Sequence, residues 1–374
     1  MKKFLSYALA SVMVFSQAVA AVPAKQVFAE ETKTVGIAMP TNSLERWNRD
    51  GAYLEEQFKA AGYDTILKYS DNDVQQQNDD IQNMIAEGAD LLLITAVDGD
   101  SLSQTLAEAK EKDIPVVAYD RLIMNTDAVT VYVSFDNYTV GKLQGQFVEE
   151  KLDLANAEGP FNIEFTAGDP ADNNAGYFFN GAFDLLKPYI DEGKLNVVSG
   201  QTGFEQVATE KWATDAALER FQNILASFYA DGTQLDVALC SNDSTALGVA
   251  QAITSDYAGS NAPIVTGQDG DIANLRNIVD GIQTMTVYKN VADEAAVTLD
   301  VAKAILAGEA IDDSLLANLS AEAAFDTESY DNGTGIIPSY LLVPWTVTAD
   351  DLQKLVDTGL YKWDADEKYL EAVE

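Results

Sequence analysis

The feature that most constrains the fold is an alternation of short apolar runs with longer amphipathic segments along nearly the whole chain. Between the apolar runs, hydrophobic residues recur at helical spacing, as do Leu54, Phe58 and Ala61. Strands without polar alternation that are separated by helices indicate parallel sheets covered by helices on both faces. The apolar runs form two series, at 34–39, 90–96, 114–119 and 130–135, and at 161–166, 195–199, 235–240, 263–267 and 283–288. The sequence therefore predicts an α/β protein with two doubly wound parallel-sheet lobes.

The segment after residue 288 shows how the two lobes are connected. It contains an amphipathic stretch at 290–307, a polar loop at 310–334, a strand at 336–343 and a terminal helix at 349–358. A chain that crosses between the lobes near 134–138, returns after 288 and crosses again near 338 accounts for these elements. We therefore expect a three-segment hinge, with an N-terminal lobe of residues 30–136 plus 289–337 and a C-terminal lobe of residues 137–288 plus 338–374.

The N-terminus has the features of a cleavable signal peptide over residues 1–29. Lys2 and Lys3 precede an apolar run at 4–15 that is too short to span a membrane, and small residues with two candidate cleavage points follow. Cys240 is the single cysteine and lies far from these cleavage points, so no lipid anchor is expected there. The sequence predicts an exported protein, periplasmic or extracellular.

Composition excludes several classes of function. The chain has 23 Lys and Arg against 60 Asp and Glu, a formal net charge of −37, which disfavours binding to nucleic acid or to anionic membranes. It contains no histidine, which excludes His-based catalytic triads and histidine metal ligands. The acidic stretch 71–82 departs from a calcium loop at Val74, Gln76 and Gln82. We expect neither a metal ion nor a cofactor.

Polar and aromatic side chains follow most of the predicted strands. In open α/β sheets, ligands bind beyond the carboxyl ends of the strands, so these residues are candidates for a binding site. The candidates are Arg46, Trp47, Asp120, Arg121, Asp172, Asn174, Trp212, Asn242, Asp269 and Lys289. Carboxylates paired with guanidinium or amide groups saturate the hydroxyls of a sugar with charge-assisted hydrogen bonds, and flat indoles cover its C–H faces. The residue types therefore favour a monosaccharide ligand.

Seven stretches carry a family resemblance: LERW (44–47), AYDR (118–121), FDN (135–137), DNNA (172–175), SND (241–243), GQDGD (267–271) and TMTVYK (284–289). They resemble periplasmic pentose- and hexose-binding proteins, and most closely the xylose-binding and multiple-monosaccharide-binding branch, from about residue 33 to the C-terminus. The resemblance implies the type I periplasmic binding protein fold. It also implies that the candidate residues above other than Trp47 hold the sugar. Phe204 competes with Trp212 as the stacking aromatic.

The resemblance further implies a substrate-binding component of an ABC sugar importer, which captures xylose, glucose, galactose or arabinose between its lobes. Its expected partners are the monosaccharide and a membrane-embedded ABC permease, with a chemoreceptor or sensor kinase left open. We expect a monomer that binds no nucleic acid. Three acids (Asp120, Asp172, Asp269) and three bases (Arg46, Arg121, Lys289) predict a formally neutral pocket that favours an uncharged aldopyranose.

Two alternatives use the same residues or the same fold. A secreted glycosidase needs two positioned carboxylates, which the three aspartates can supply. The neighbouring cations hold these carboxylates ionised, however, and this suits binding rather than proton transfer. A sugar-responsive repressor would carry a basic helix-turn-helix at the N-terminus, where this chain has the predicted signal peptide. We therefore expect a binding protein and not an enzyme.

Overall fold

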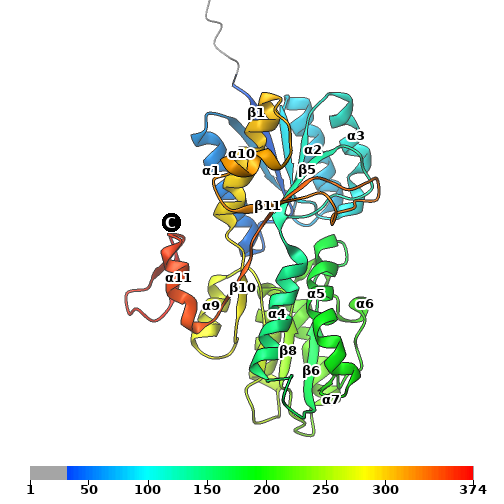
Figure 1. The fold of residues 1–374 in the computed structure, drawn as a ribbon, viewed down its shortest axis with the longest axis vertical. Coiled ribbons are helices and arrows are strands. Elements are labelled where there is room, and N and C mark those ends of the chain that lie inside the picture. Colours follow the sequence, from blue (N-terminus) through cyan, green and yellow to red (C-terminus); the bar gives the residue numbers. More distant parts are fainter. Residues whose placement is uncertain (1–31, 374) are drawn as a thin grey trace, which may run out of the picture. The chain divides into compact units, whose positions relative to one another are not determined.

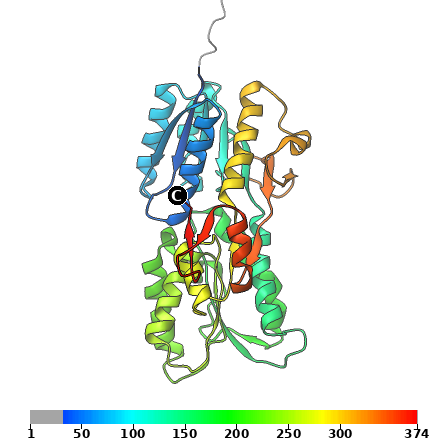
Figure 2. The same cartoon turned by 90° about the vertical axis from the view of Figure 1, so that its left-hand side faces the viewer.

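The computed structural model describes residues 32–373, so the predicted signal peptide at 1–29 lies outside the described residues. These residues form two lobes, each built on its own parallel sheet with helices on both faces (Figures 1 and 2). The predicted α/β class with two parallel-sheet lobes is confirmed. In the described part of the chain, no helix is both long and apolar enough to cross a membrane.

The N-terminal lobe contains a seven-stranded sheet with the order β11-β12-β5-β4-β3-β1-β2. All neighbouring strands run parallel except the edge pair β11 and β12, and the 2-1-3-4-5 order of the first five strands is that of a doubly wound fold. The strands are β1 (Thr34–Met39), β2 (Asp64–Tyr69), β3 (Leu91–Ile94), β4 (Val116–Tyr119), β5 (Val129–Phe135), β11 (Ala323–Asp326) and β12 (Ser339–Leu342). The helices are α1 (Glu45–Ala60), α2 (Val74–Glu87), α3 (Ser103–Glu111) and α10 (Val291–Ala307).

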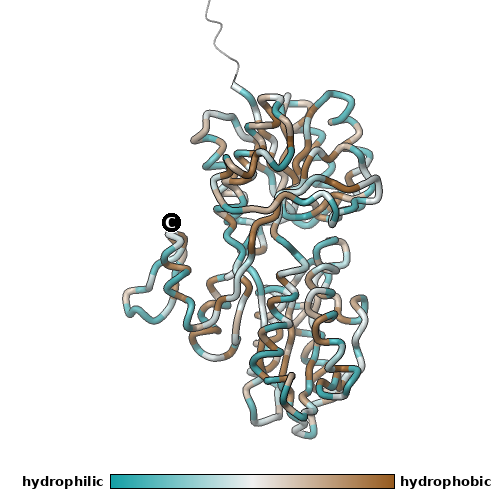
Figure 3. Tube along the Cα trace, in the orientation of Figure 1, coloured by the Kyte–Doolittle hydropathy of each residue, from teal (hydrophilic) through white to brown (hydrophobic). Residues whose placement is uncertain are grey.

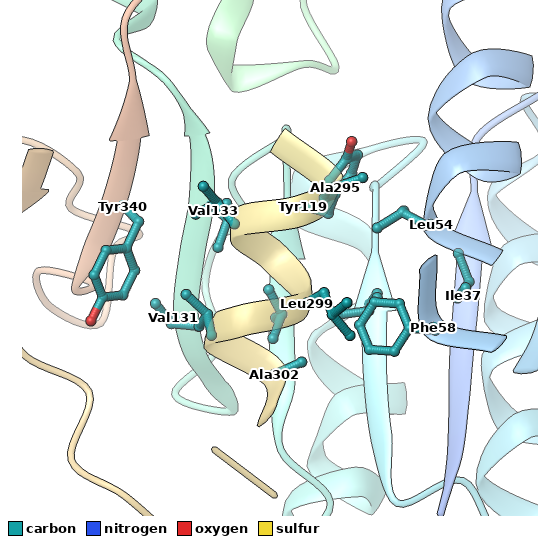
Figure 4. Close-up of a cluster of buried hydrophobic side chains, with 14 of the residues drawn as sticks. Ile37, Leu54, Phe58, Tyr119, Val131, Val133, Ala295, Leu299, Ala302 and Tyr340 are labelled. Atoms are coloured by element: carbon teal, nitrogen blue, oxygen red, sulfur yellow. The ribbon is translucent and has the colours of Figure 1, made fainter. Parts of the chain in front are cut away.

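Two apolar clusters, one on each face, hold this sheet in place. On one face, α1 and α10 cover the strands, and Figure 4 shows Leu299 of α10 near Val131 of β5 and Phe58 of α1. On the other face, α2 and α3 bury Ile81, Met84 and Leu106. Strands such as β3 and β4 are buried along their whole length because both faces are covered. Figure 3 shows the same distribution, with hydrophobic residues inside each lobe.

The C-terminal lobe repeats this plan on a four-stranded parallel sheet with the order β7-β6-β8-β9. Helices α4 and α5 pack on one face, and α7 and α8 on the other. The strands are β6 (Phe161–Thr166), β7 (Leu195–Asn196), β8 (Val237–Cys240) and β9 (Ile264–Val265). The helices are α4 (Asn137–Lys151), α5 (Asn173–Asp191), α6 (Phe204–Val207), α7 (Thr214–Phe228), α8 (Asp243–Asp256) and α9 (Ile272–Val279).

The chain passes between the lobes after β5, after β10 (Thr286–Tyr288) and between β12 and β13 (Trp345–Val347). Strands β10 and β13 pair antiparallel, so the second and third crossings lie side by side. The third crossing differs from the boundary expected at 337/338. Because Ser339–Leu342 pairs in register with β5, β12 belongs to the N-terminal sheet and the chain leaves that lobe only after Leu342.

The C-terminal segment is attached to the C-terminal lobe. It consists of α11 (Leu352–Asp357) and a hairpin of β14 (Tyr361–Trp363) and β15 (Leu370–Ala372). Leu355, Tyr361 and Leu370 pack with Leu275 and Ile278 of α9 in one apolar cluster. In Figure 2 this segment, coloured red, lies beside the ends of α1 and α9.

Candidate functional site

A cavity lies where the carboxyl ends of strands from both lobes meet the hinge. The N-terminal lobe contributes residues that follow β1 and β4, and the C-terminal lobe contributes residues that follow β6, β8 and β9. The cavity is lined by Leu44, Arg46, Trp47, Asp120, Arg121, Asp172, Phe178, Trp212, Asn242, Ser244, Gln268, Asp269 and Lys289. The structure therefore brings together all of the candidate residues except Asn174.

Arg46, in the first turn of α1, is the centre of a buried charge cluster. Its Nη1 donates to Asp269 Oδ1 at 2.9 Å, and its Nη2 donates to Asp120 Oδ2 at 2.7 Å. Two further carboxylates reach it from behind: Asp50 accepts from Nε at 2.7 Å, and Glu294 accepts from Nη2 at 2.9 Å. Sequence reasoning missed these last two, although the i,i+4 spacing of Arg46 and Asp50 on a helix was a usable signal.

The carboxylates around Arg46 have pKa values that are shifted in opposite directions. Burial alone would raise the pKa of Asp120, but Arg46, Lys289 and Arg121 outweigh it and lower that pKa to about 2. Lys289 and Arg46 likewise lower the pKa of Asp269 against the effect of burial. For Glu294, burial raises the pKa well above its usual range, and the charge of Asp120 adds to the rise. Asp120 and Asp269 are thus hydrogen-bond acceptors at the cavity, while burial of Glu294 disfavours its charged form.

Lys289, directly after β10 at the second crossing, joins the acids of the two lobes. Its Nζ lies 3.4 Å from Asp120 Oδ2 and 3.3 Å from Asp269 Oδ1. The same ammonium lies over the rings of Phe135 and Phe178, at 5.7 and 5.5 Å from their centroids. Its position between two carboxylates and two aromatic faces holds a positive charge at the hinge.

A second ion pair crosses between the lobes on the other side of the cavity. Arg121 Nε of the N-terminal lobe lies 2.9 Å from Asp172 Oδ2 of the C-terminal lobe. The same oxygen accepts a hydrogen bond from Trp212 Nε1 at 3.2 Å, and Asp172 Oδ1 caps α5 by accepting from the backbone N–H of Asn174 at 3.0 Å. Trp47 lies against both Arg46 and Arg121, whose Cζ atoms are 5.1 and 4.9 Å from its ring.

Of the two competing aromatics, Trp212 lines the cavity and Phe204 does not. Phe204 packs edge-on against Phe179 in the lobe core. Trp212 has a positive φ of 55°, which is unfavourable for a bulky residue, and a Cβ on Gly168 would lie 1.9 Å from its ring. The position of this indole therefore requires a strained backbone at Trp212 and a residue without a side chain at position 168. Phe178, packed edge-on against it, is an aromatic that the sequence did not reveal.

Asn174 lies beside the cavity, and its amide is used inside the protein. Its Oδ1 accepts a hydrogen bond from Tyr132 at 3.0 Å, and its Nδ2 donates to the backbone carbonyl of Asp120 at 2.6 Å. That carbonyl also accepts from Ser134 at 2.9 Å. Asn174 therefore contacts the turn in which Asp120 adopts a φ of 57°, and so helps to position the carboxylate that faces the cavity.

Several polar atoms of the lining residues remain free for a ligand. Within residues 32–373, no hydrogen bond uses Asp120 Oδ1, Asp269 Oδ2 or Gln268 Oε1 as an acceptor, and none uses Asn242 Nδ2 or Arg121 Nη2 as a donor. Gln268 was missed because its place in the GQDGD stretch, directly before Asp269, was the only signal for it. The cavity thus offers both acceptors and donors beside aromatic faces, the combination that recognises hydroxyl groups on an apolar ring.

Comparison with known proteins supports the same conclusion. The family model described as "Periplasmic binding protein domain" matches residues 35–310. The chain belongs to this family. It is 41% identical to the multiple sugar-binding periplasmic receptor ChvE of Rhizobium radiobacter, over 90% of this chain and 93% of that relative. It is 33% identical to the D-xylose-binding periplasmic protein of Escherichia coli, over 89% of this chain and 92% of that relative.

Solved structures agree with the sequence relatives. A solute-binding protein of an ABC transporter from Clostridium phytofermentans with bound β-D-glucose has 50% identity and a TM-score of 0.83, and covers 90% of this chain and 99% of its own. A carbohydrate-transporter solute-binding protein from Chloroflexus aurantiacus in complex with D-glucose has 29% identity and a TM-score of 0.76. The match covers 90% of this chain and 98% of that chain. The chain therefore belongs to the multiple-sugar- and xylose-binding branch of the periplasmic sugar-binding proteins, which is a family of binding proteins and not of enzymes.

Proposed function

We propose that this protein binds one neutral monosaccharide in the interlobe cavity and delivers it to an ABC sugar importer. The observation that carries the proposal is the set of unpaired acceptors and donors at the cavity wall, drawn from both lobes. D-glucose is the first ligand to test, because the solved relatives from Clostridium phytofermentans and Chloroflexus aurantiacus contain it. D-xylose and D-galactose belong to the same class of uncharged aldopyranose.

The groups at the cavity wall match the chemistry of a pyranose. Each sugar hydroxyl donates one hydrogen bond and accepts others, so a carboxylate oxygen beside an amide or guanidinium N–H satisfies it fully. Among the described residues, Asp120 Oδ1 and Arg121 Nη2 have no hydrogen-bond partner on one lobe, and Asp269 Oδ2 and Asn242 Nδ2 have none on the other. A sugar that bonds to both lobes binds the closed form more tightly than the open form, and this difference is the source of any ligand-driven closure.

The charge of the site favours neutral sugars over uronic acids. All the nitrogens of Arg46 are occupied by carboxylates, and Lys289 already lies between Asp120 and Asp269. Asp50 and Glu294 hold the Arg46 guanidinium on its other side, so it is not available to turn towards a ligand carboxylate. A uronate would bring another negative charge into a site whose cations are committed.

The proposal includes export of the protein and its interaction with membrane partners. The N-terminal residues 1–29 act as a cleavable signal peptide, and the exported protein works as a monomer. Its macromolecular partner is the membrane-embedded ABC permease, and a chemoreceptor or sensor kinase is a further partner of the closed form. The acidic charge of the chain, −37, argues against a nucleic-acid partner.

A thermal-shift panel tests this function. The protein without its signal peptide is purified, unfolded and refolded to remove bound sugar, and melted with D-glucose, D-xylose, D-galactose, D-glucuronate and a polyol control. A ligand at 100 times its Kd stabilises the folded state by about 2.7 kcal/mol, so binding raises Tm visibly. The expected result is a rise with the neutral aldopyranoses. No rise in Tm with any monosaccharide would contradict the proposal. In a separate assay, hydrolysis of nitrophenyl glycosides by the protein would also contradict it.

A further inference from the structure

A second set of contacts joins the two lobes outside the cavity. Arg49 of α1 is not part of the cavity lining and bonds to the loop that follows β9 in the opposite lobe. Its Nη2 donates to the carbonyl of Asp269 at 3.1 Å and to Asp271 Oδ1 at 3.0 Å. Its Nη1 donates to the carbonyl of Gly270 at 3.2 Å and to Tyr361 Oη at 2.9 Å. One guanidinium on the N-terminal lobe thus makes four hydrogen bonds to the C-terminal lobe.

Glu45, one helical turn before Arg49, contacts the same loop. Its Oε1 accepts a hydrogen bond from the backbone N–H of Ile272 at 3.2 Å, at the first residue of α9. This carboxylate lies where the helix leaves backbone N–H groups without partners inside the helix. Neither Glu45 nor Arg49 lines the cavity. Together they bind both the carbonyl groups and the first helical N–H of the segment 269–272.

The segment that they bind carries a residue of the sugar site in an unfavourable conformation. Asp269 has a φ of 106°, which is rare for any residue with a side chain, and Gly270 follows with a φ of 72°. Added to Gly270, a Cβ would lie 2.9 Å from Tyr288 and 3.2 Å from Tyr361, so this loop is packed closely. Tyr361 of the C-terminal hairpin also donates to the carbonyl of Gly270 at 2.9 Å.

We propose that Glu45, Arg49 and Tyr361 form an interlobe clasp on the segment 269–272, which positions Asp269 and slows the release of sugar without touching it. The proposal rests on the sugar-binding function above. Because Arg49 and its acceptors belong to different lobes, rotation of the lobes away from each other breaks these bonds. The clasp therefore stabilises the closed form alone, and it acts equally on every sugar that the cavity accepts.

The clasp should change the release of every sugar by the same factor, whereas a residue that contacted the sugar directly should affect different sugars differently. Arg49→Met removes all four hydrogen bonds, and bonds to a charged group contribute enough that loss of the clasp raises the dissociation rate on the order of 10- to 100-fold. The association rate should change far less than the dissociation rate, because interface changes act mostly on dissociation. Arg49→Lys, which keeps the charge, restores part of the loss, and Tyr361→Phe gives a smaller increase.

The test is stopped-flow tryptophan fluorescence with D-glucose and D-xylose, since Trp47 and Trp212 line the cavity. Lys59→Met is the matched control, because the Lys59 side chain lies on the same helix, is 55% exposed and forms an ion pair with Glu55 of that helix. Urea unfolding of the sugar-free proteins is measured alongside. The expected result is faster release of both sugars by the same factor in Arg49→Met, with an unchanged unfolding midpoint and normal kinetics in the control.

Three results would contradict the clasp while leaving the proposed function intact. These are a wild-type dissociation rate in Arg49→Met, an effect on one sugar but not the other, and a fall in the unfolding midpoint of the sugar-free variant that accounts for the change. If the wild-type protein bound neither these two sugars nor any other monosaccharide of the thermal-shift panel, the proposed function itself would be wrong, and the clasp with it.

Discussion

Asn242 gives a sharp test of the site because the oxygen and the nitrogen of its side-chain amide have separate roles. It follows β8, where its Oδ1 caps α8 by accepting from the backbone N–H of Thr245 at 2.9 Å. Its Nδ2 has no partner in the described part of the chain and belongs to the cavity lining. A substitution that keeps the cap and removes the free donor therefore isolates the contribution of Asn242 to sugar binding.

Asn242→Ser is that substitution, because serine caps helices about as well as asparagine. The loss of one donor leaves a sugar hydroxyl desolvated without a partner, which costs about 1–3 kcal/mol, or roughly 5- to 150-fold in Kd. Asn242→Ala should lose the same affinity and in addition about 1 kcal/mol of unfolding free energy, because it removes the cap.

Isothermal titration calorimetry with D-glucose measures the affinity, and urea denaturation of the sugar-free proteins measures the stability. We expect Asn242→Ser to bind weakly and unfold like the wild type, and Asn242→Ala to bind weakly and unfold more easily. Wild-type affinity in Asn242→Ser would show that the free amide does not reach the sugar and would refute the assignment.

Three further predictions follow from the site. Gly168→Ala displaces Trp212, whose ring lies 1.9 Å from the added Cβ, and should weaken glucose binding about tenfold in calorimetry; an unchanged Kd would remove Trp212 from the site. The wild type should bind glucuronate at least about tenfold less tightly than glucose, and equal Kd values for the two sugars in the wild type would refute this. Lys289→Met should weaken the binding of glucose and, more strongly, that of glucuronate. The raised pKa of Glu294 stabilises the folded protein at low pH, a contribution lost as the pH rises from the unfolded value through the folded one. Glu294→Gln should therefore gain unfolding free energy relative to the wild type as the pH rises above the usual glutamate pKa of about 4.3, by at most about 1.4 kcal/mol per pH unit; a constant difference in urea denaturation would contradict it.

The sequence revealed the buried parallel strands but not the strands at the sheet edges. Runs such as β3 and β4 are buried on both faces and therefore read as continuous apolar stretches. The edge strand β2 contains no fully buried residue and mixes Asp64 and Lys68 with apolar residues, so it was missed. Strand β11, in the stretch expected to be a polar loop, was missed for the same reason.

Site residues that directly follow a strand could be predicted from the sequence. Site residues that meet only through long-range packing could not. Residues that directly follow strands, such as Asp120 and Asn242, line the cavity as the topology rule implies. Glu294 reaches Arg46 only because the chain returns to the first lobe and lays α10 beside α1, a packing that no local pattern encodes. The third crossing was placed too early for a similar reason, since the pairing of β12 with β5 is a long-range contact.

Calorimetric titration of the refolded, sugar-free wild-type protein with D-glucose tests the central claim most directly. If the cavity between the lobes is a monosaccharide site, the titration gives saturable binding of one glucose per chain, and the heat disappears when Asp120 and Asn242 are replaced together by alanine in a protein that remains folded. No saturable heat with glucose, xylose or galactose, or undiminished binding in the double variant, would contradict the account.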